Sequence, residues 1–440
     1  MLGADTHMDD RDRFLARRCG ALACAVAAVG VLVSAAPQQP QVQGPTFRSS
    51  VDVVAVDVQV VDRDGQPIAG LGADDFDVSI DNRRHRVLTA ELVQYDASAT
   101  RPSLSPITMD VSRAAGVTLP AGGPSDRVYV LAVDETSFAA NEAQTAMVAA
   151  RHFIDRLQKN DIVGLYLYPY GSGRLDLFHD HFPVSRSLSR VVGRRDSISS
   201  EFHLTMSEVV DIAAGNGDTF ADVLARECNP RDPFSASCPG RIRAEVAVNS
   251  GYLESLASQS LGSLRDLVRG LTGLPGRKTL VVVSGGLASS DRAGGRPDVS
   301  GLVLNIGEEA SLSNTNVYML HIDSSFLEAF SANGQRPTGM ATYGDGLSTA
   351  PTFLRDGQLM SAGLERVAAA SGGKFLRVQA GTSDSAFDRV LRETSAYYLL
   401  GVEPVDIDRN DRLHVIRVKV NAKGAAVQNR TSVFIPKVGR

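Results

Sequence analysis

Tryptophan is absent from this sequence, and aromatic side chains make up only 6% of its 440 residues. This scarcity argues against a broad groove that stacks carbohydrate rings or nucleic-acid bases. The formal net charge is −5, and no block of basic residues is interleaved with aromatic ones. We therefore expect no nucleic-acid partner. The length is large for one domain and ordinary for two.

Long apolar runs are missing except for one near the N-terminus, at residues 20–33. Four arginines between Arg11 and Arg18 precede this run, and the small residues 34–36 follow it. This order is typical of a secretory signal peptide. We interpret residues 1–36 as a signal peptide and expect an exported protein, either periplasmic or secreted. An uncleaved N-terminal membrane anchor is the alternative, because the run is only slightly short for a membrane span.

Cysteine is rare, and two of the four cysteines lie in the predicted signal peptide. The other two, Cys228 and Cys238, bracket a turn-rich loop. Neighbouring cysteines of an exported protein usually pair, so we predict a disulfide between them. Two free thiols are the alternative. A metal site is disfavoured, because no further cysteine or nearby histidine accompanies the pair.

Segments of alternating apolar and polar residues lie toward both ends of the chain. Residues 37–46 form a linker rich in proline and glutamine, and residues 47–96 then show the alternation of short antiparallel strands. Residues 397–437 return to strand-like patterns. The N-terminal module has few strands for a core of its own. We therefore expect the two segments to pack together as one small β-sandwich.

The region between these segments predicts an α/β domain. After a linker at residues 97–125, residues 126–396 alternate apolar strands with helical segments, which predicts a doubly wound, mainly parallel sheet. Residues 185–243 are less regular and include the cysteine loop 228–238, and residues 324–356 form a Gly-, Ser- and Thr-rich insertion. The expected strands are 128–133, 161–168, 278–284, 317–322 and 374–377, and the expected helices are 139–158, 244–271, 357–371 and 383–395.

Polar residues follow two of the predicted strands and recur in one loop. Asp134 directly follows a strand and is followed by Thr136 and Ser137, a later strand ends at Ser284, and a loop carries Thr219. The carboxyl ends of parallel strands meet at one edge of a sheet, where ligands bind. We therefore expect these residues to form a binding rim. The alternative is that the polar residues only cap strands and helices.

These motifs resemble those of the von Willebrand factor type A domain. Residues 274–278 before a predicted strand and residues 395–401 at the start of the tail add to the likeness, and the whole order resembles the VWFA-related proteins of Acidobacteria. The resemblance covers almost everything after the signal peptide. It implies a Rossmann-like α/β fold. It also implies a metal-ion-dependent adhesion site, which takes an aspartate and two hydroxyls from one loop, a threonine from a second and an aspartate from a third.

The adhesion site implied by this resemblance is incomplete. Asp134, Thr136 and Thr219 match the family's ligands and are the candidate Mg²⁺ ligands. Phe138 stands at the second hydroxyl position, and Gly285 replaces the third-loop aspartate. With a single carboxylate left, Mg²⁺ would bind weakly.

We interpret the chain as a protein without enzymatic activity that binds a protein partner or an envelope surface through this rim. An exported hydrolase is one alternative, but the sequence reveals no pair of nucleophile and base. A structural envelope component with an inert rim is the other.

Overall fold

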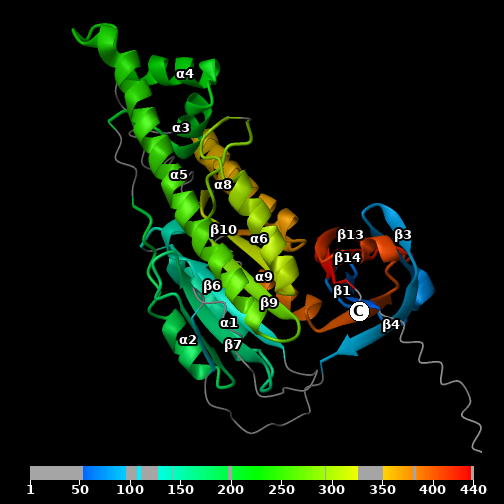
Figure 1. Cartoon of the computed structure of the whole chain (residues 1–440). Helices are drawn as coiled ribbons and strands as arrows, with labels where there is room; N and C mark the ends of the chain where they lie inside the picture. Colours follow the sequence, from blue (N-terminus) through cyan, green and yellow to red (C-terminus); the bar gives the residue numbers. More distant parts are fainter. Residues whose placement is uncertain are drawn as a thin grey trace, which may run out of the picture. The chain divides into compact units, whose positions relative to one another are not determined.

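The computed structural model describes most of the chain after residue 52. It contains one seven-stranded, mainly parallel sheet and two four-stranded antiparallel sheets (Figure 1). The mixed α/β class is therefore confirmed. The predicted signal peptide, the first linker and most of the second linker and of the insertion lie outside the described residues. Those residues are 53–95, 107–110, 127–140, 142–196, 201–292, 294–325, 350–379 and 383–437.

The large sheet has the strand order of a doubly wound fold, β11-β10-β9-β6-β7-β8-β5. The five strands from β11 to β7 are mutually parallel, and β8 pairs antiparallel with β7 and β5. All residues of β6 and β9 are buried, because layers cover both faces of the sheet. The bounds are β5 (Ile107–Asp110), β6 (Val128–Asp134), β7 (Ile162–Tyr168), β8 (Arg174–Phe178), β9 (Lys278–Ser284), β10 (Thr315–Asp323) and β11 (Lys374–Gln379).

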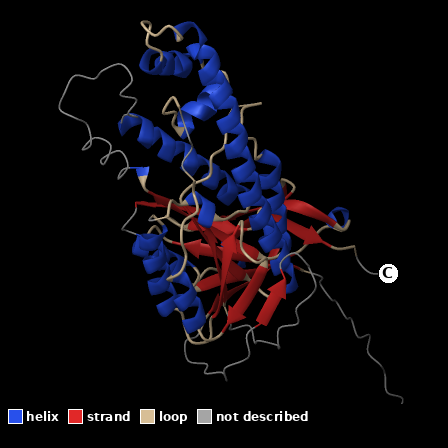
Figure 2. Cartoon of the chain, turned by 90° about the vertical axis from the view of Figure 1, so that its left-hand side faces the viewer, coloured by secondary structure: helices blue, strands red, loops and turns tan. Residues whose placement is uncertain are grey.

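Helices pack on both faces of this sheet (Figure 2). Alternate residues of β6 point to opposite faces, as strand geometry requires. Tyr129 and Leu131 lie in the core with α1, α2 and α9, whereas Val130 and Ala132 lie in the core with α5, α6 and α8. The bounds are α1 (Ala143–Asp155), α2 (Phe182–Leu188), α5 (Cys238–Gly270), α6 (Ser300–Leu312), α8 (Ala350–Ala370) and α9 (Ser383–Glu393).

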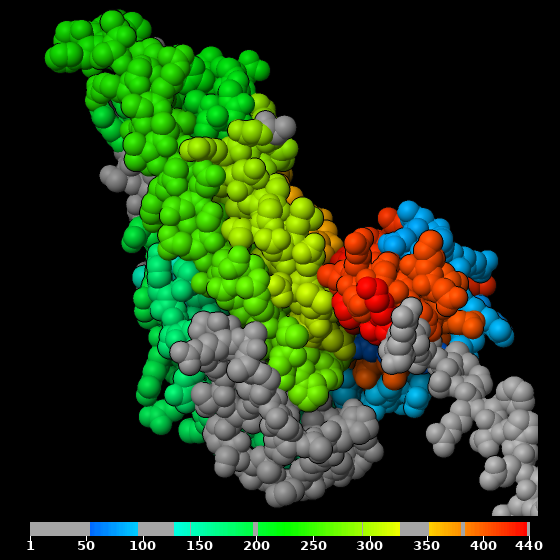
Figure 3. Space-filling view, viewed as in Figure 1, coloured from blue at the N-terminus to red at the C-terminus, as the bar shows by residue number. Residues whose placement is uncertain are grey.

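The two antiparallel sheets form a β-sandwich from both ends of the described chain (Figure 3). Their orders are β14-β1-β12-β4 and β15-β13-β2-β3. The C-terminal strand β12 lies between the N-terminal strands β1 and β4, which agrees with the packing expected from the alternating segments. The bounds are β1 (Val54–Val61), β2 (Phe76–Ile80), β3 (Arg83–His85), β4 (Val87–Gln94), β12 (Ala396–Val402), β13 (Arg412–Val420), β14 (Ala426–Asn429) and β15 (Ser432–Ile435).

The region that looked less regular in sequence contains two further helices, α3 (Met206–Ala213) and α4 (Gly217–Glu227). Local signals for both are present. Thr205 and Glu208 form a capping box at the start of α3, and the Asn216 side chain caps α4. The prediction that this region is less regular is therefore wrong where α3 and α4 form.

Further elements were not among those expected from the sequence, and α6 and β5 are two of them. Helix α6 has buried residues at 303, 306, 307 and 310, the spacing of an amphipathic helix. Leu304 on its outer face is 64% exposed, and such apolar outer residues obscure the pattern. Strand β5 lies within the predicted linker 97–125 and pairs with β8 at the edge of the sheet.

A small separate core joins α3, α4 and the N-terminal half of α5. Val209, Val223 and Ile242 are fully buried in it. Cys228 follows α4 and Cys238 begins α5, and a disulfide joins them. The predicted disulfide is confirmed, and it joins the end of α4 to the start of α5 within this core.

Replacing both Cys228 and Cys238 by serine is expected to destabilise the α3–α4 unit. Opening a loop with a sequence separation of 10 costs about 3 kcal/mol in the chain-entropy model. Amide hydrogen exchange in α4 is then expected to be faster by a factor on the order of one hundred, with exchange in β9 unchanged. Wild-type protein under reducing conditions is the control. Unaltered exchange in α4 would contradict a stabilising role.

Candidate functional site

A cavity lies beside the carboxyl ends of β6 and β9. These strands are neighbours at the centre of the sheet, and the strands that follow them, β7 and β10, lie on opposite sides of the pair. Open α/β sheets bind ligands at such a switch point. The cavity volume is about 310 Å³, at the small end of the range for ligand sites. It has room for one long side chain or a small molecule.

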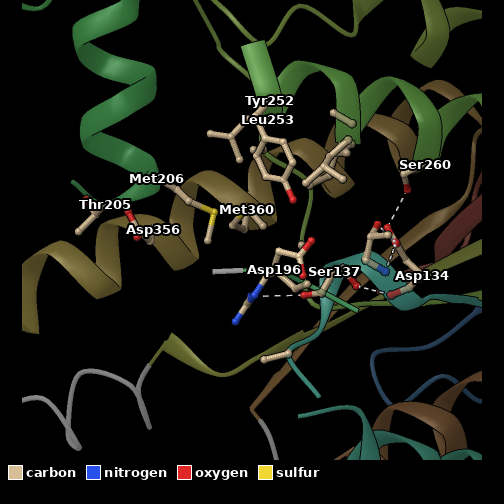
Figure 4. A pocket seen from close by; sticks show the side chains of 18 of the residues that line it. Asp134, Ser137, Asp196, Thr205, Met206, Tyr252, Leu253, Ser260, Asp356 and Met360 are labelled. Carbon is tan, nitrogen blue, oxygen red and sulfur yellow. Dashed lines mark hydrogen bonds between the residues drawn. The ribbon is translucent and has the colours of Figure 1, made fainter. Parts of the chain in front are cut away.

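The walls of the cavity are mainly apolar, and polar groups lie at both ends and also, with Ser137 and Asp196, between them (Figure 4). Asp134 and Ser260 lie at one end, and Asp356 lies at the other, with Met360 between them. The lining residues come from the loops after β6 and β9, from α5 and α8, and from the start of α3. They are Asp134, Thr136, Ser137, Ala139, Arg195, Asp196, Leu204, Thr205, Met206, Tyr252, Leu253, Leu256, Ala257, Ser260, Gly286, Leu287, Ala288, Phe353, Asp356 and Met360.

Asp134 ends β6 and is only 3% exposed. Its Oδ1 accepts hydrogen bonds from the backbone N–H (3.1 Å) and the hydroxyl (2.8 Å) of Thr136, and its Oδ2 accepts one from the Ser260 hydroxyl (2.7 Å). These partners are neutral dipoles. Burial raises the pKa of the carboxyl to about 6, and the hydrogen bonds oppose this rise only in part. At neutral pH the group is therefore a largely ionised carboxylate in a buried position.

Ser137 joins the loop after β6 to the loop after β9. Its hydroxyl donates to the carbonyl oxygen of Asp134 (2.7 Å) and accepts from the N–H of Gly285 (2.8 Å). A Cβ atom on residue 285 would lie 2.4 Å from the carbonyl oxygen of Ser137. The two loops therefore pack too closely for the aspartate that a complete adhesion site has at this position.

Phe138, at the other position that departs from the adhesion-site pattern, is 2% exposed. Its ring lies in the core beside α1, on the face of the sheet that α1, α2 and α9 cover. An apolar side chain that contributes to packing thus stands at the position where the resemblance implies a serine hydroxyl.

Three of the five predicted rim residues, Asp134, Thr136 and Ser137, line the cavity together. Ser284 is fully buried and does not belong to the cavity lining. Its hydroxyl donates to the carbonyl of Gly286 (3.2 Å) and accepts from the N–H of the same residue (3.1 Å). Ser284 therefore stabilises the turn that shapes the rim.

Thr219 is not brought to this rim. It lies in the first turn of α4, its N–H donates to Oδ1 of the cap residue Asn216 (3.3 Å), and its hydroxyl donates to Asp211 (3.5 Å). Helix α4, which holds it, packs with α3 and α5 and lies farther from β6 than α3 does (Figure 1). The expectation that Thr219 shares a site with Asp134 is therefore wrong, because local helix capping already uses this residue.

Ser260 and Asp356 also supply polar groups at the two ends of the cavity, although the sequence did not single them out. Ser260 of α5 donates to Asp134. Asp356 of α8 accepts a hydrogen bond from the N–H of Ser207 (2.8 Å) at the start of α3, and burial raises the pKa of its carboxyl to about 6. No local pattern marks either residue, because only the packing of α5 and α8 directs them to the cavity.

Arg195 and Tyr252 lie near the opening of the cavity. Arg195 donates to both carboxylate oxygens of Glu142 at 2.9 Å and to the carbonyl oxygen of Ser137 at 3.3 Å. Tyr252 is 37% exposed, and the neighbouring Asp196 is also exposed. The opening is thus surrounded by groups that remain accessible to a partner.

Comparisons with known proteins give no relative: neither a scan against protein-family models nor a search of curated proteins returns a match. In the described part of the chain, no helix is both long and apolar enough to cross a membrane. The function therefore has to be inferred from the cavity itself.

Replacing Asp134 by asparagine is expected to raise the free energy of unfolding at about pH 8 by about 1–3 kcal/mol. The folded carboxyl has a pKa of about 6 against an ordinary value of 3.8 for aspartate. Between these values the folded state keeps a proton that the unfolded state has lost, so stability falls as pH rises through this window. Asparagine keeps an acceptor for Thr136 and carries no charge.

Urea unfolding across this pH range measures the effect of Asp134→Asn. The exposed Asp155, at the end of α1, provides the control variant Asp155→Asn. The gain in stability is expected to shrink as pH falls from about 7 toward 4. A gain that does not vary with pH, or a loss at every pH, would contradict an ionised buried carboxylate.

Proposed function

We propose that this protein is an exported binding module with a von Willebrand factor type A-like domain, and that a side chain of a protein partner enters the cavity beside β6 and β9. One observation carries the proposal: an apolar-walled cavity at the switch point has a buried carboxylate, Asp134, at one end. Burying a charge without a counter-charge costs stability. Ionisable groups with shifted pKa values gather at functional sites.

The strand order supports the type A-like domain. Counted along the chain from β6, and leaving out the edge strand β5, the sheet reads 3-2-1-4-5-6 with strand 3 antiparallel. This is the order of doubly wound nucleotide-binding folds as well, so the placement of Asp134 after the first strand is the additional feature that favours a type A-like domain.

Export is supported by two features. The arginine-flanked apolar run at residues 20–33 has the organisation of a signal peptide. The Cys228–Cys238 disulfide is typical of oxidising compartments.

Binding is favoured over hydrolysis by the residues of the cavity. Its lining includes neither histidine nor cysteine. Its two buried carboxylates, Asp134 and Asp356, are each held by hydrogen bonds from neighbouring hydroxyl or backbone groups. The hydroxyls of Ser260 and Thr136 donate to Asp134, but no histidine among the described lining residues lies beside them to act as a base.

The residues present do not fit the Mg²⁺ site that the family resemblance implies. The Asp134 oxygens accept from Thr136 and Ser260, Thr219 lies in α4, and residue 285 has no room for a carboxylate. The described residues also contain no group of three or more His, Cys, Asp or Glu side chains placed to hold a metal. Mg²⁺ is usually bound through one or two carboxylates and several waters, and here both oxygens of the one candidate carboxylate already accept hydrogen bonds from the protein.

Isothermal titration with Mg²⁺ is expected to give no binding tighter than about the millimolar range, the weak end of protein cation sites. The same heats are expected for wild type and for Asp134→Asn, because the carboxylate is not part of a metal site. Thr219→Ala is the matched control. Micromolar binding that Asp134→Asn abolishes would overturn this assignment.

Filling the cavity is expected to abolish partner binding. Peptides are first selected from a random displayed library for binding to the wild-type protein. The selected peptides are expected to bind Leu256→Trp at least about tenfold more weakly than they bind wild type. Leu256 lines the cavity and is only partly buried, so the larger ring fits at the opening without disturbing the core. Leu304→Trp, on the exposed face of α6, is the control. The proposal is wrong if every selected peptide binds Leu256→Trp as well as wild type.

A further inference from the structure

We propose that the group entering the cavity is a cation on an apolar stem, namely a lysine or arginine side chain of the protein partner. This proposal rests on the function proposed above and adds the charge of the occupant. Three features carry it: the charges that line the cavity, the burial of its carboxylates, and the apolar walls between its two ends.

The lining carries an excess of negative charge. Among the described residues, three carboxylates line the cavity, those of Asp134, Asp196 and Asp356, and the one cationic side chain is that of Arg195. Arg195 already has a counter-charge, because it donates to both oxygens of Glu142, which is not part of the lining. The positive charge of Arg195 is therefore matched outside the cavity, and the three carboxylates remain unmatched within it.

Because two of these carboxylates are buried, the cavity is selective for the charge of the group that enters it. Asp134 is 3% exposed and Asp356 is 9% exposed, and their hydrogen-bond partners are hydroxyl and amide groups. Electrostatic interactions are stronger in such a setting than in water. An entering anion would be repelled by both carboxylates. A neutral group would displace the remaining water without supplying an opposite charge. A cation is the one of the three that offsets the cost of burying the carboxylates.

The walls require that the charge be carried on an apolar stem. Leu253 and Met360 lie between the Asp134 end and the Asp356 end (Figure 4), and Leu256 also lines the cavity. Lysine and arginine carry their charge beyond three or four methylene groups, which pack along apolar surface while the head meets polar groups. A bare cation would leave most of the cavity volume of about 310 Å³ without contacts.

The opening favours a protein side chain over a free amine. Tyr252 is 37% exposed and Asp196 is exposed beside it, so a partner surface around the inserted side chain has groups to contact. Exposed tyrosine is characteristic of protein interfaces. The negative lining and a basic anchor are also complementary in charge, which gives specificity to the encounter.

Methyl NMR of methionine-labelled protein tests the charge of the occupant directly. Met206 and Met360 line the cavity, and Met147 is buried on the other face of the sheet as an internal control. The probes are hexylammonium, hexanol and hexanoate, which differ in charge and share one stem. At about pH 8 hexylammonium is expected to shift the Met206 and Met360 signals and to bind at least about tenfold more tightly than the other two probes.

Isosteric variants test which groups select the cation. Asp134→Asn and Asp356→Asn each keep a hydrogen-bond acceptor and lose the charge, and each is expected to weaken hexylammonium binding by about tenfold while leaving hexanol binding unchanged. Asp155→Asn, remote from the cavity, is expected to leave both unchanged. In the displayed peptides described above, replacing the basic anchor by norleucine is expected to abolish binding.

Each unexpected result of these experiments would contradict a different part of the proposal. If hexanol binds as tightly as hexylammonium, or hexanoate more tightly, the cationic occupant is wrong while binding in the cavity stands. The cationic occupant is also wrong if no probe shifts Met206 or Met360, or if peptides blocked by Leu256→Trp tolerate norleucine. If hexylammonium binds but no selected peptide depends on the cavity, the site takes a free amine and the protein side chain is wrong.

Discussion

The hydrogen bonds around the Asp134 carboxylate join parts of the chain that are far apart in sequence. Thr136 comes from the turn after β6, and Ser260 comes from the middle of α5. Ser137 then links the same turn to Gly285 after β9. These bonds supply donors to a carboxylate that is almost wholly buried, and losing one would leave a buried acceptor without its partner. The positions of β6, β9 and α5 at the rim therefore depend on one another. The cavity exists where these elements meet.

The loops after β6 and β9 are in direct contact at the rim. Where the adhesion site of the resembling family places an aspartate, the backbone of Gly285 lies against Ser137, and Phe138 is turned into the core. The loops therefore need no cation to hold them together. Among the described residues the hydrogen-bond partners of Asp134 are neutral, and in our proposal a basic group of a partner supplies the opposite charge.

Much of the fold could be predicted from the sequence, and about half of the site. Residues after a buried strand, such as Asp134, are placed by strand periodicity alone, and a short cysteine spacing predicts its own disulfide. Thr219 could not be placed, because its position in a type A-like pattern and its position in a capped helix look alike in sequence. Asp356 could not be found, since a carboxylate beside the start of α3 is a consequence of how α8 packs.

The sequence by itself determined the α/β class, the pairing of both chain ends in a sandwich, the disulfide, and the carboxylate at the end of β6. These depend on local periodicity and on spacing along the chain. Only the tertiary structure decided what surrounds that carboxylate: the hydroxyl of Ser260, the second buried carboxylate of Asp356, and the closeness of Ser137 to Gly285. Burial and electrostatics depend on what lies nearby in space, and Ser260, which donates to Asp134, is 126 residues away from it along the chain.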